Sequence, residues 1–217
     1  MTYSEGNRKG KKILNAYFTP EEICEQMWEL AKVHGYDGGT VLEPSVGTGN
    51  MIVHAPDKSK VTGLETEAEY FEVVKNRFPP STFHNVFFEQ VFLQPERYRH
   101  DYEGDTTWLK GYPFSLVIGN PPYGKFSGRW ASYFPRTKEP KMSNYEFFFM
   151  WYGLKLLKKG GLLIYIAPQN FLNTGFNQYK KEKEAILKVG ELIDAYEMGS
   201  IFKDTKVPTH ILVFRKK

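Results

Sequence analysis

The sequence has very little cysteine and no long apolar run. Its single cysteine, Cys24, can form no disulfide within the chain and lies in an amphipathic segment, so we expect a buried thiol and a reducing, cytoplasmic environment. No apolar run approaches the ~18 residues of a membrane-spanning helix, and residues 1–12 are polar and basic. The sequence therefore predicts a protein that is neither exported nor bound to a membrane.

A strong excess of one charge is also missing. The chain carries 29 lysine and arginine residues against 25 aspartate and glutamate residues, which suits either a polyanionic partner or an ordinary soluble enzyme. Aromatic residues are plentiful instead, with 14 Tyr, 17 Phe and 4 Trp. This exceeds what packing alone usually requires, and some of the rings could stack on nucleic-acid bases.

The apolar pattern predicts an α/β fold in a single domain over residues 1–217. Residues 21–33 repeat apolar side chains at helical spacing, with Thr19 as the expected N-cap and Pro20 at the first helical position. Short β-rich runs alternate with further helical patterns, which favours a doubly wound, mostly parallel, Rossmann-like sheet. The seven expected strands are residues 41–42, 61–64, 86–88, 114–118, 162–167, 192–196 and 211–214. The last two should pair as a C-terminal antiparallel hairpin.

Three segments show neither helical nor strand periodicity. Residues 1–13 are expected to be flexible, and residues 94–113 to form a solvated surface loop. Residues 124–142 mix lysine and arginine with phenylalanine, tryptophan and tyrosine, which predicts a long loop near the active site. Such a loop could hold a nucleic-acid backbone, and a solvated connection is an equally good interpretation.

A glycine-rich turn follows the first expected strand. Residues 41–50 read Val-Leu-Glu-Pro-Ser-Val-Gly-Thr-Gly-Asn, and the glycines would let a ligand approach the backbone closely. Glu65 ends the next apolar run, where a carboxylate in a doubly wound fold can accept hydrogen bonds from both ribose hydroxyls. No further glycine stands at phosphate-binding spacing. A nucleoside ligand without a pyrophosphate, such as S-adenosylmethionine, therefore fits better than a dinucleotide.

The most informative stretch is Asn120-Pro121-Pro122-Tyr123, which follows an apolar strand. Two successive prolines stiffen the backbone, so the Asn120 side-chain oxygen and the Pro121 carbonyl can both accept hydrogen bonds from one amino group. Tyr123 offers a ring face to a planar base. Direct transfer of a methyl group to an amine that is activated in this way demands no general base. This accounts for the lack of a compelling histidine or cysteine nucleophile.

These motifs give the chain a resemblance to the gamma-class N6-adenine DNA methyltransferases, from about Leu14 to the C-terminus. The resemblance implies S-adenosylmethionine as cofactor, no metal, and DNA as partner, with the target adenine flipped out of the duplex. It makes Asn120, Pro121, Pro122 and Tyr123 catalytic and places the flipped base against Tyr123 and Phe202. The implied cofactor-binding residues are Tyr17, Phe18, Thr19, Pro20, Glu43, Pro44, Gly47, Gly49, Glu65, Phe92 and Asn120.

Two departures from the family pattern matter. The family usually has an acidic residue before a Phe-Leu pair, where it binds the adenine of the cofactor, but this chain has Val91 there, with Glu89 and Gln90 as the nearest substitutes. Relatives also usually continue beyond the final hairpin into a target-recognition domain, whereas this sequence stops at Lys217. We therefore expect weak sequence selectivity or a separate specificity subunit.

Other interpretations of the same residues stay open. Asn-Pro-Pro-Tyr also occurs in release-factor glutamine methyltransferases and in some RNA adenine methyltransferases, although the element Tyr17 to Pro20 favours DNA. A catalytically quiet, methyltransferase-like subunit that binds nucleic acid is a further alternative. The intact motif from Asn120 to Tyr123 argues against it.

Overall fold

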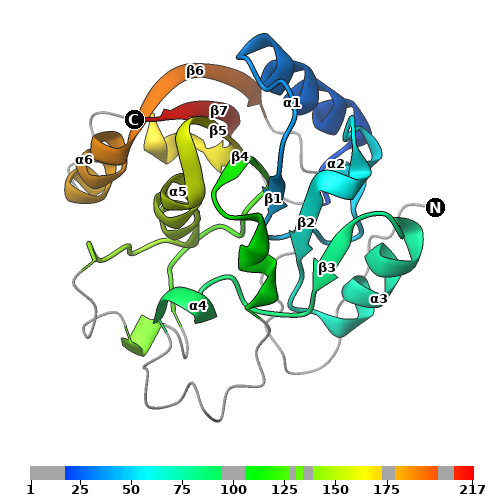
Figure 1. The fold of residues 1–217 in the computed structure, drawn as a ribbon. Coiled ribbons are helices and arrows are strands. Elements are labelled where there is room, and N and C mark those ends of the chain that lie inside the picture. The colour runs from blue at the N-terminus through cyan, green and yellow to red at the C-terminus, as the bar shows by residue number, and fades with distance from the viewer. Residues whose placement is uncertain (1–17, 94–105, 128–130, 134–138, 173–178, 200–207) are drawn as a thin grey trace.

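The computed structural model describes residues 18–93, 106–127, 131–133, 139–172, 179–199 and 208–217. Within them, seven strands form one sheet in the order β3-β2-β1-β4-β5-β7-β6, and helices pack on both of its faces (Figure 1). The strands are β1 (Val41–Glu43), β2 (Val61–Leu64), β3 (Thr82–His84), β4 (Phe114–Gly119), β5 (Leu157–Pro168), β6 (Gly190–Gly199) and β7 (Thr209–Lys216). The helices are α1 (Glu21–Val33), α2 (Asn50–Val53), α3 (Ala68–Arg77), α4 (Gln90–Leu93), α5 (Tyr145–Leu156) and α6 (Lys180–Val189).

Strand pairing confirms the predicted α/β architecture. Strands β1 to β5 pair in parallel, and β1 stands between β2 and β4, so the strand order reverses there. Strand β7 lies between β5 and β6 and pairs antiparallel with both, which forms the expected C-terminal hairpin. In open α/β sheets, ligands bind outside the carboxyl ends of the strands at the point where the order reverses.

The two faces of the sheet carry separate hydrophobic clusters. Along β5, Leu163, Tyr165 and Ala167 belong to the cluster that includes α5, whereas Leu162 and Ile164 belong to the cluster that includes α1. This alternation is the period of two that a strand imposes on its side chains. A strand buried on both faces therefore reads as a continuous apolar run, as it does in this sequence.

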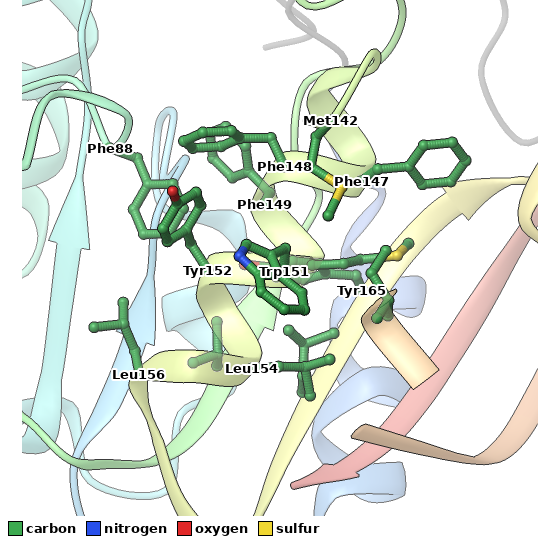
Figure 2. Packing of buried hydrophobic residues seen from close by; sticks show 14 of the residues in the cluster. Phe88, Met142, Phe147, Phe148, Phe149, Trp151, Tyr152, Leu154, Leu156 and Tyr165 are labelled. Carbon is green, nitrogen blue, oxygen red and sulfur yellow. The ribbon is translucent and has the colours of Figure 1, made fainter. Parts of the chain in front are cut away.

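Helix α5 is buried on all sides, which explains much of the aromatic content. Every residue of this helix except Lys155 is buried, so the helix has no solvent face. Figure 2 shows the rings of Phe148 and Phe149 on this helix close to the ring of Phe88. Phe148 stacks on Phe126 with ring centroids 4.8 Å apart, and Phe88 lies 4.7 Å from Phe149. Many of the rings therefore build the core.

The third strand lies earlier in the sequence than predicted. Residues 82–84 form β3, whereas Val86 and Phe88 of the predicted strand 86–88 are buried after the strand has ended. The Asn85 side-chain amide donates to the Glu65 carbonyl at 2.8 Å, just beyond the last paired residues. A short apolar run predicts burial, but by itself it does not distinguish a strand from another buried segment.

Two further expectations need correction. Pro20, rather than Thr19, is the N-cap of α1, and its carbonyl accepts from the amides of Ile23 and Cys24, both at 3.1 Å. The Thr19 carbonyl instead accepts from the Asn50 side chain, as shown below. In the segment predicted as a solvated loop, Trp108 is 2% exposed within a short 3-10 helix, Thr107–Gly111. Residues 94–105 of the predicted loop lie outside the described residues.

Candidate functional site

The predicted site residues converge at the carboxyl ends of β1, β2 and β4. Strand β1 ends at Glu43, β2 is followed by Glu65, and β4 is followed by Asn120. The parallel register places these ends side by side, because Glu43 pairs with Gly63 and Leu42 pairs with Val117. Residues that are far apart in the sequence therefore meet where the strand order reverses. Tyr17 and Phe202 lie outside the described residues.

The glycine-rich loop, residues 44–49, is held against β2 by its own backbone. The Val46 amide donates to the Leu64 carbonyl at 2.9 Å, and the Gly49 amide donates to the Val46 carbonyl at 2.9 Å. Gly49 has a φ of +84°, and a side chain there would come within 2.6 Å of the Phe78 ring. Both the left-handed backbone and the close approach of Phe78 thus require glycine at this position.

Glu65 ties the glycine-rich loop to the end of β2. Its Oε2 accepts from the Gly47 amide and its Oε1 from the Glu67 amide, both at 2.8 Å. Each carboxylate oxygen keeps a further lone pair, so Glu65 can still accept hydrogen bonds from a ligand. Burial raises the pKa of Glu65, and hydrogen bonds from the backbone amides of Glu67, Gly47 and Thr66 oppose that rise.

Glu43 is the most unusual residue of the site. Its side chain is 4% exposed, and its Oε2 has no hydrogen-bond partner among the described residues. Burial, together with the charge of Glu65, raises the pKa of Glu43 well above its ordinary range. Gly119 leaves room beside it, since a side chain at Gly119 would come within 3.3 Å of the Glu43 Cγ. A buried carboxyl group without a partner suits a ligand that brings a cation or a hydrogen-bond donor.

Phe18, Thr19 and Pro20, which were predicted to bind the cofactor, lie close to the glycine-rich loop. The Phe18 ring lies 3.5 Å from where a Gly47 side chain would begin, and it packs edge-on against Tyr70 at 5.4 Å. The Thr19 carbonyl accepts from the Asn50 side-chain amide at 3.0 Å. These contacts hold Phe18 and Thr19 next to the glycine-rich loop and the first residue of α2.

Asn120 is held from two sides. The Ser45 hydroxyl in the glycine-rich loop donates to the Asn120 backbone carbonyl at 3.1 Å. On the other side, the Tyr123 hydroxyl donates a hydrogen bond to the Asn120 Oδ1. Pro121 between them is buried, and Asn120, Pro122 and Tyr123 are half-buried. Sequence reasoning missed Ser45, because a serine in a glycine-rich turn has no distinctive pattern.

The chain beyond Tyr123 is fixed by a second residue that sequence reasoning missed, Glu146. Its Oε2 accepts from the Gly124 amide at 3.0 Å, and its Oε1 accepts from the Asn144 side chain at 2.8 Å. The Tyr145 amide also donates to the Gly124 carbonyl at 2.9 Å. Both ends of the predicted loop 124–142 are therefore joined next to residues 120–123. The only sign of Glu146 in the sequence was a single carboxylate at the start of a largely apolar helix.

Val91 stands where the expected acidic residue would be, and whether Glu89 or Gln90 replaces that residue stays a prediction. The Phe92 ring stacks on Tyr152 at 3.9 Å, and its amide donates to the Glu89 carbonyl at 3.2 Å. Glu89 is buried, which raises its pKa to about 7. The Phe92 ring is thus directed into the aromatic cluster around α5, and its part in cofactor binding stays a prediction.

Two searches of the described residues give negative results. No group of three or more His, Cys, Asp or Glu side chains in this part of the chain is arranged to hold a metal ion. No described helix combines the length and apolar character needed to cross a membrane.

The chain matches a family of known proteins over most of its length. The model of the family described as Eco57I restriction-modification methylase matches residues 59–202. The type II methyltransferase M.TthHB8I of Thermus thermophilus is 26% identical over 122 residues, which are 50% of this chain and 28% of that protein. The chain spans between 7% and 48% of the length of four curated relatives.

Two solved structures share the fold. A modification subunit of a candidate type I restriction enzyme from Vibrio vulnificus YJ016 has a TM-score of 0.71 and 18% identity, over 94% of this chain and 45% of that one. A candidate class I S-adenosylmethionine-dependent methyltransferase from Listeria monocytogenes has a TM-score of 0.66 and 20% identity, over 96% and 63%. At these identities the likeness concerns the fold alone, which is that of class I methyltransferases.

The burial of Glu43 predicts that Glu43→Gln stabilises the ligand-free protein in a pH-dependent way. Because the pKa of the folded state is raised, the folded protein holds a proton that the unfolded chain loses above pH ~4.3, so stability falls as pH rises from there. The free energy of unfolding of Glu43→Gln should exceed that of the wild type by more than ~1 kcal/mol at pH 7.5, since each pKa unit corresponds to ~1.4 kcal/mol. At pH 4 the gain should vanish. Urea unfolding at both pH values measures it, and a variant that is less stable at pH 7.5 would contradict it.

Proposed function

Since the chain belongs to the Eco57I restriction-modification methylase family, we propose that it transfers a methyl group from S-adenosylmethionine to N6 of adenine in DNA. The observation that carries this proposal is the contact between the glycine-rich loop and Asn120. Ser45 joins the loop that would hold the cofactor to the residue that would hold the target amine, at 3.1 Å. The methyl donor and the target amine would then be bound next to each other at the carboxyl ends of the strands.

The two buried carboxyl groups of Glu43 and Glu65 support S-adenosylmethionine as the cofactor. This molecule is a nucleoside that carries a sulfonium and an ammonium group and no phosphate. Glu65 keeps acceptor capacity for two ribose hydroxyls, and the Glu43 Oε2 lacks a partner that a cationic group would supply. When bound, the cofactor supplies an electrophilic methyl group. The backbone of residues 44–49 would lie against it.

Asn120 would activate the target amine by accepting its protons. An amino nitrogen conjugated to a purine is a poor nucleophile until its lone pair is drawn out of the ring system. With the Asn120 Oδ1 and the Pro121 carbonyl as acceptors, the nitrogen would become more tetrahedral and would attack the sulfonium methyl carbon in line, so that the N–C bond forms as the S–C bond breaks and S-adenosylhomocysteine leaves. One N6 proton would then be lost to solvent, so no general base is needed. Acceptors that are already oriented toward the developing charge lower the barrier without reorganisation.

DNA as substrate requires that the adenine leave the double helix, because N6 is not accessible to this site in a duplex. Tyr123, half-buried beside Asn120, would stack on the extruded base, and Phe202 would pack on its other side. We also propose that a separate specificity subunit or further segment reads the DNA sequence. The likeness to a modification subunit of a candidate type I enzyme is compatible with such an arrangement.

Cofactor binding should depend on Glu65. Glu65→Ala removes the acceptor for two ribose hydroxyls and also releases the Gly47 amide, so affinity for S-adenosylmethionine should fall at least ~10-fold. Calorimetry measures the affinity. Glu67→Ala is the matched control, because it removes an exposed carboxylate two residues away whose side chain does not hold the loop. Equal affinities for the two variants would remove the basis of the cofactor assignment.

Asn120 should be needed for transfer and not for cofactor binding. Asn120→Ala deletes one preoriented contact to the reacting amine, so methylation of adenine should slow by ~10²-fold or more, while affinity for S-adenosylmethionine stays within a few-fold. Asn76→Ala, which shortens an exposed asparagine on α3, should retain the wild-type rate. Radiolabel transfer to DNA measures the rate. The catalytic role would be disproved by an Asn120→Ala variant that methylates as fast as the Asn76→Ala variant.

A further inference from the structure

One hydrogen bond in the site involves the atom that the proposed reaction needs. The Tyr123 hydroxyl donates to the Asn120 Oδ1, which is the acceptor assigned above to the target amine. A tyrosine hydroxyl carries one proton to donate, and here that proton occupies an acceptor position on the Asn120 oxygen. In the described structure, the ring that would stack on the base therefore also holds its hydroxyl on the base-activating atom.

The Asn120 backbone is fixed independently of this contact. The Ser45 hydroxyl holds the Asn120 carbonyl at 3.1 Å, and the buried Pro121 restricts the chain that follows. Beyond Tyr123, the Gly124 amide is bound by the Glu146 carboxylate at 3.0 Å. The backbone on both sides of this pair is therefore fixed by contacts other than the one between Asn120 and Tyr123. The Tyr123 hydroxyl engages the oxygen of the Asn120 carboxamide and not its nitrogen.

We propose that the Tyr123 hydroxyl stands in for the target amino group: it caps the Asn120 oxygen while no base is bound and gives way when an N6 proton replaces it. The proposal rests on the proposed function. The cap keeps the oxygen of the carboxamide, and not its NH₂ group, directed at the position of the base. When the base enters, the hydrogen bond from the Tyr123 hydroxyl is broken and one from N6 takes its place. The cap therefore lowers the affinity for the base, because a neutral hydrogen bond must be broken first.

Tyr123→Phe separates the two roles of this residue, because it keeps the ring face and removes the cap. A neutral hydrogen bond that no longer has to be broken should make base capture about two- to tenfold more favourable. The KM for DNA should therefore fall by about two- to tenfold in Tyr123→Phe. The matched control is Tyr36→Phe, which removes a hydroxyl that binds the Gly39 carbonyl at 3.0 Å on another part of the surface.

The contact itself can be tested in the free protein by proton NMR. A capped hydroxyl exchanges slowly with water, so the wild type should give a tyrosine hydroxyl signal that is lost in Tyr123→Phe and in Asn120→Ala. The signal should persist in Tyr36→Phe. If no tyrosine hydroxyl signal disappears in both Tyr123→Phe and Asn120→Ala, the cap does not exist and the proposal is wrong.

The kinetic result can overturn the proposal separately. A KM for DNA that is unchanged or higher in Tyr123→Phe would show that the hydroxyl does not compete with the base, and a tenfold loss of kcat would make it a participant in transfer. Failure of the proposed function and failure of the proposed cap give different results. A wild-type protein that methylates no adenine would sink the proposed function, whereas the NMR signal would still decide the contact between Tyr123 and Asn120.

Discussion

Parallel pairing of the three-residue strand β1 with β2 on one side and β4 on the other determines where the site residues lie. Glu43, Glu65 and Asn120 each follow or end one of these strands, and the register alone brings them to a common edge. The glycine-rich loop, the contact from Ser45 and the contact from Glu146 then set the finer geometry around that edge.

The site is built at a cost in stability. Two carboxyl groups are buried near each other, and the Glu43 Oε2 has no partner among the residues described. Burying a carboxyl group without a partner is unfavourable whether it stays charged or takes up a proton, and a bound ligand that supplies a partner would offset this cost. Helix α5, whose first residues bind the Gly124 backbone just beyond Tyr123, buries a dense set of rings that stabilises the surrounding core.

Much of the fold was predictable from the sequence, since periodicity reports burial. The bounds of α1, the seven strands in one sheet and the final antiparallel hairpin followed from apolar spacing. The position of β3 did not, because Val86 and Phe88 are as buried as a strand residue would be. Within the site, the motifs predicted that Phe18, Glu43, Glu65 and Asn120 would come together. Ser45, Glu146 and the hydroxyl contact of Tyr123 could not be predicted, because each depends on side-chain geometry between segments that are separated in sequence or on one rotamer.

The central claim is that this site methylates N6 of adenine in DNA. The most direct test is to incubate the purified wild-type protein with S-adenosylmethionine that carries a labelled methyl group and with unmethylated DNA, RNA or peptide release factor in parallel, and then to analyse nucleosides and peptides by mass spectrometry. The account predicts label in N6-methyladenine from DNA. Label confined to methylcytosine, to RNA or to glutamine, or no transfer to any of the substrates, would contradict it.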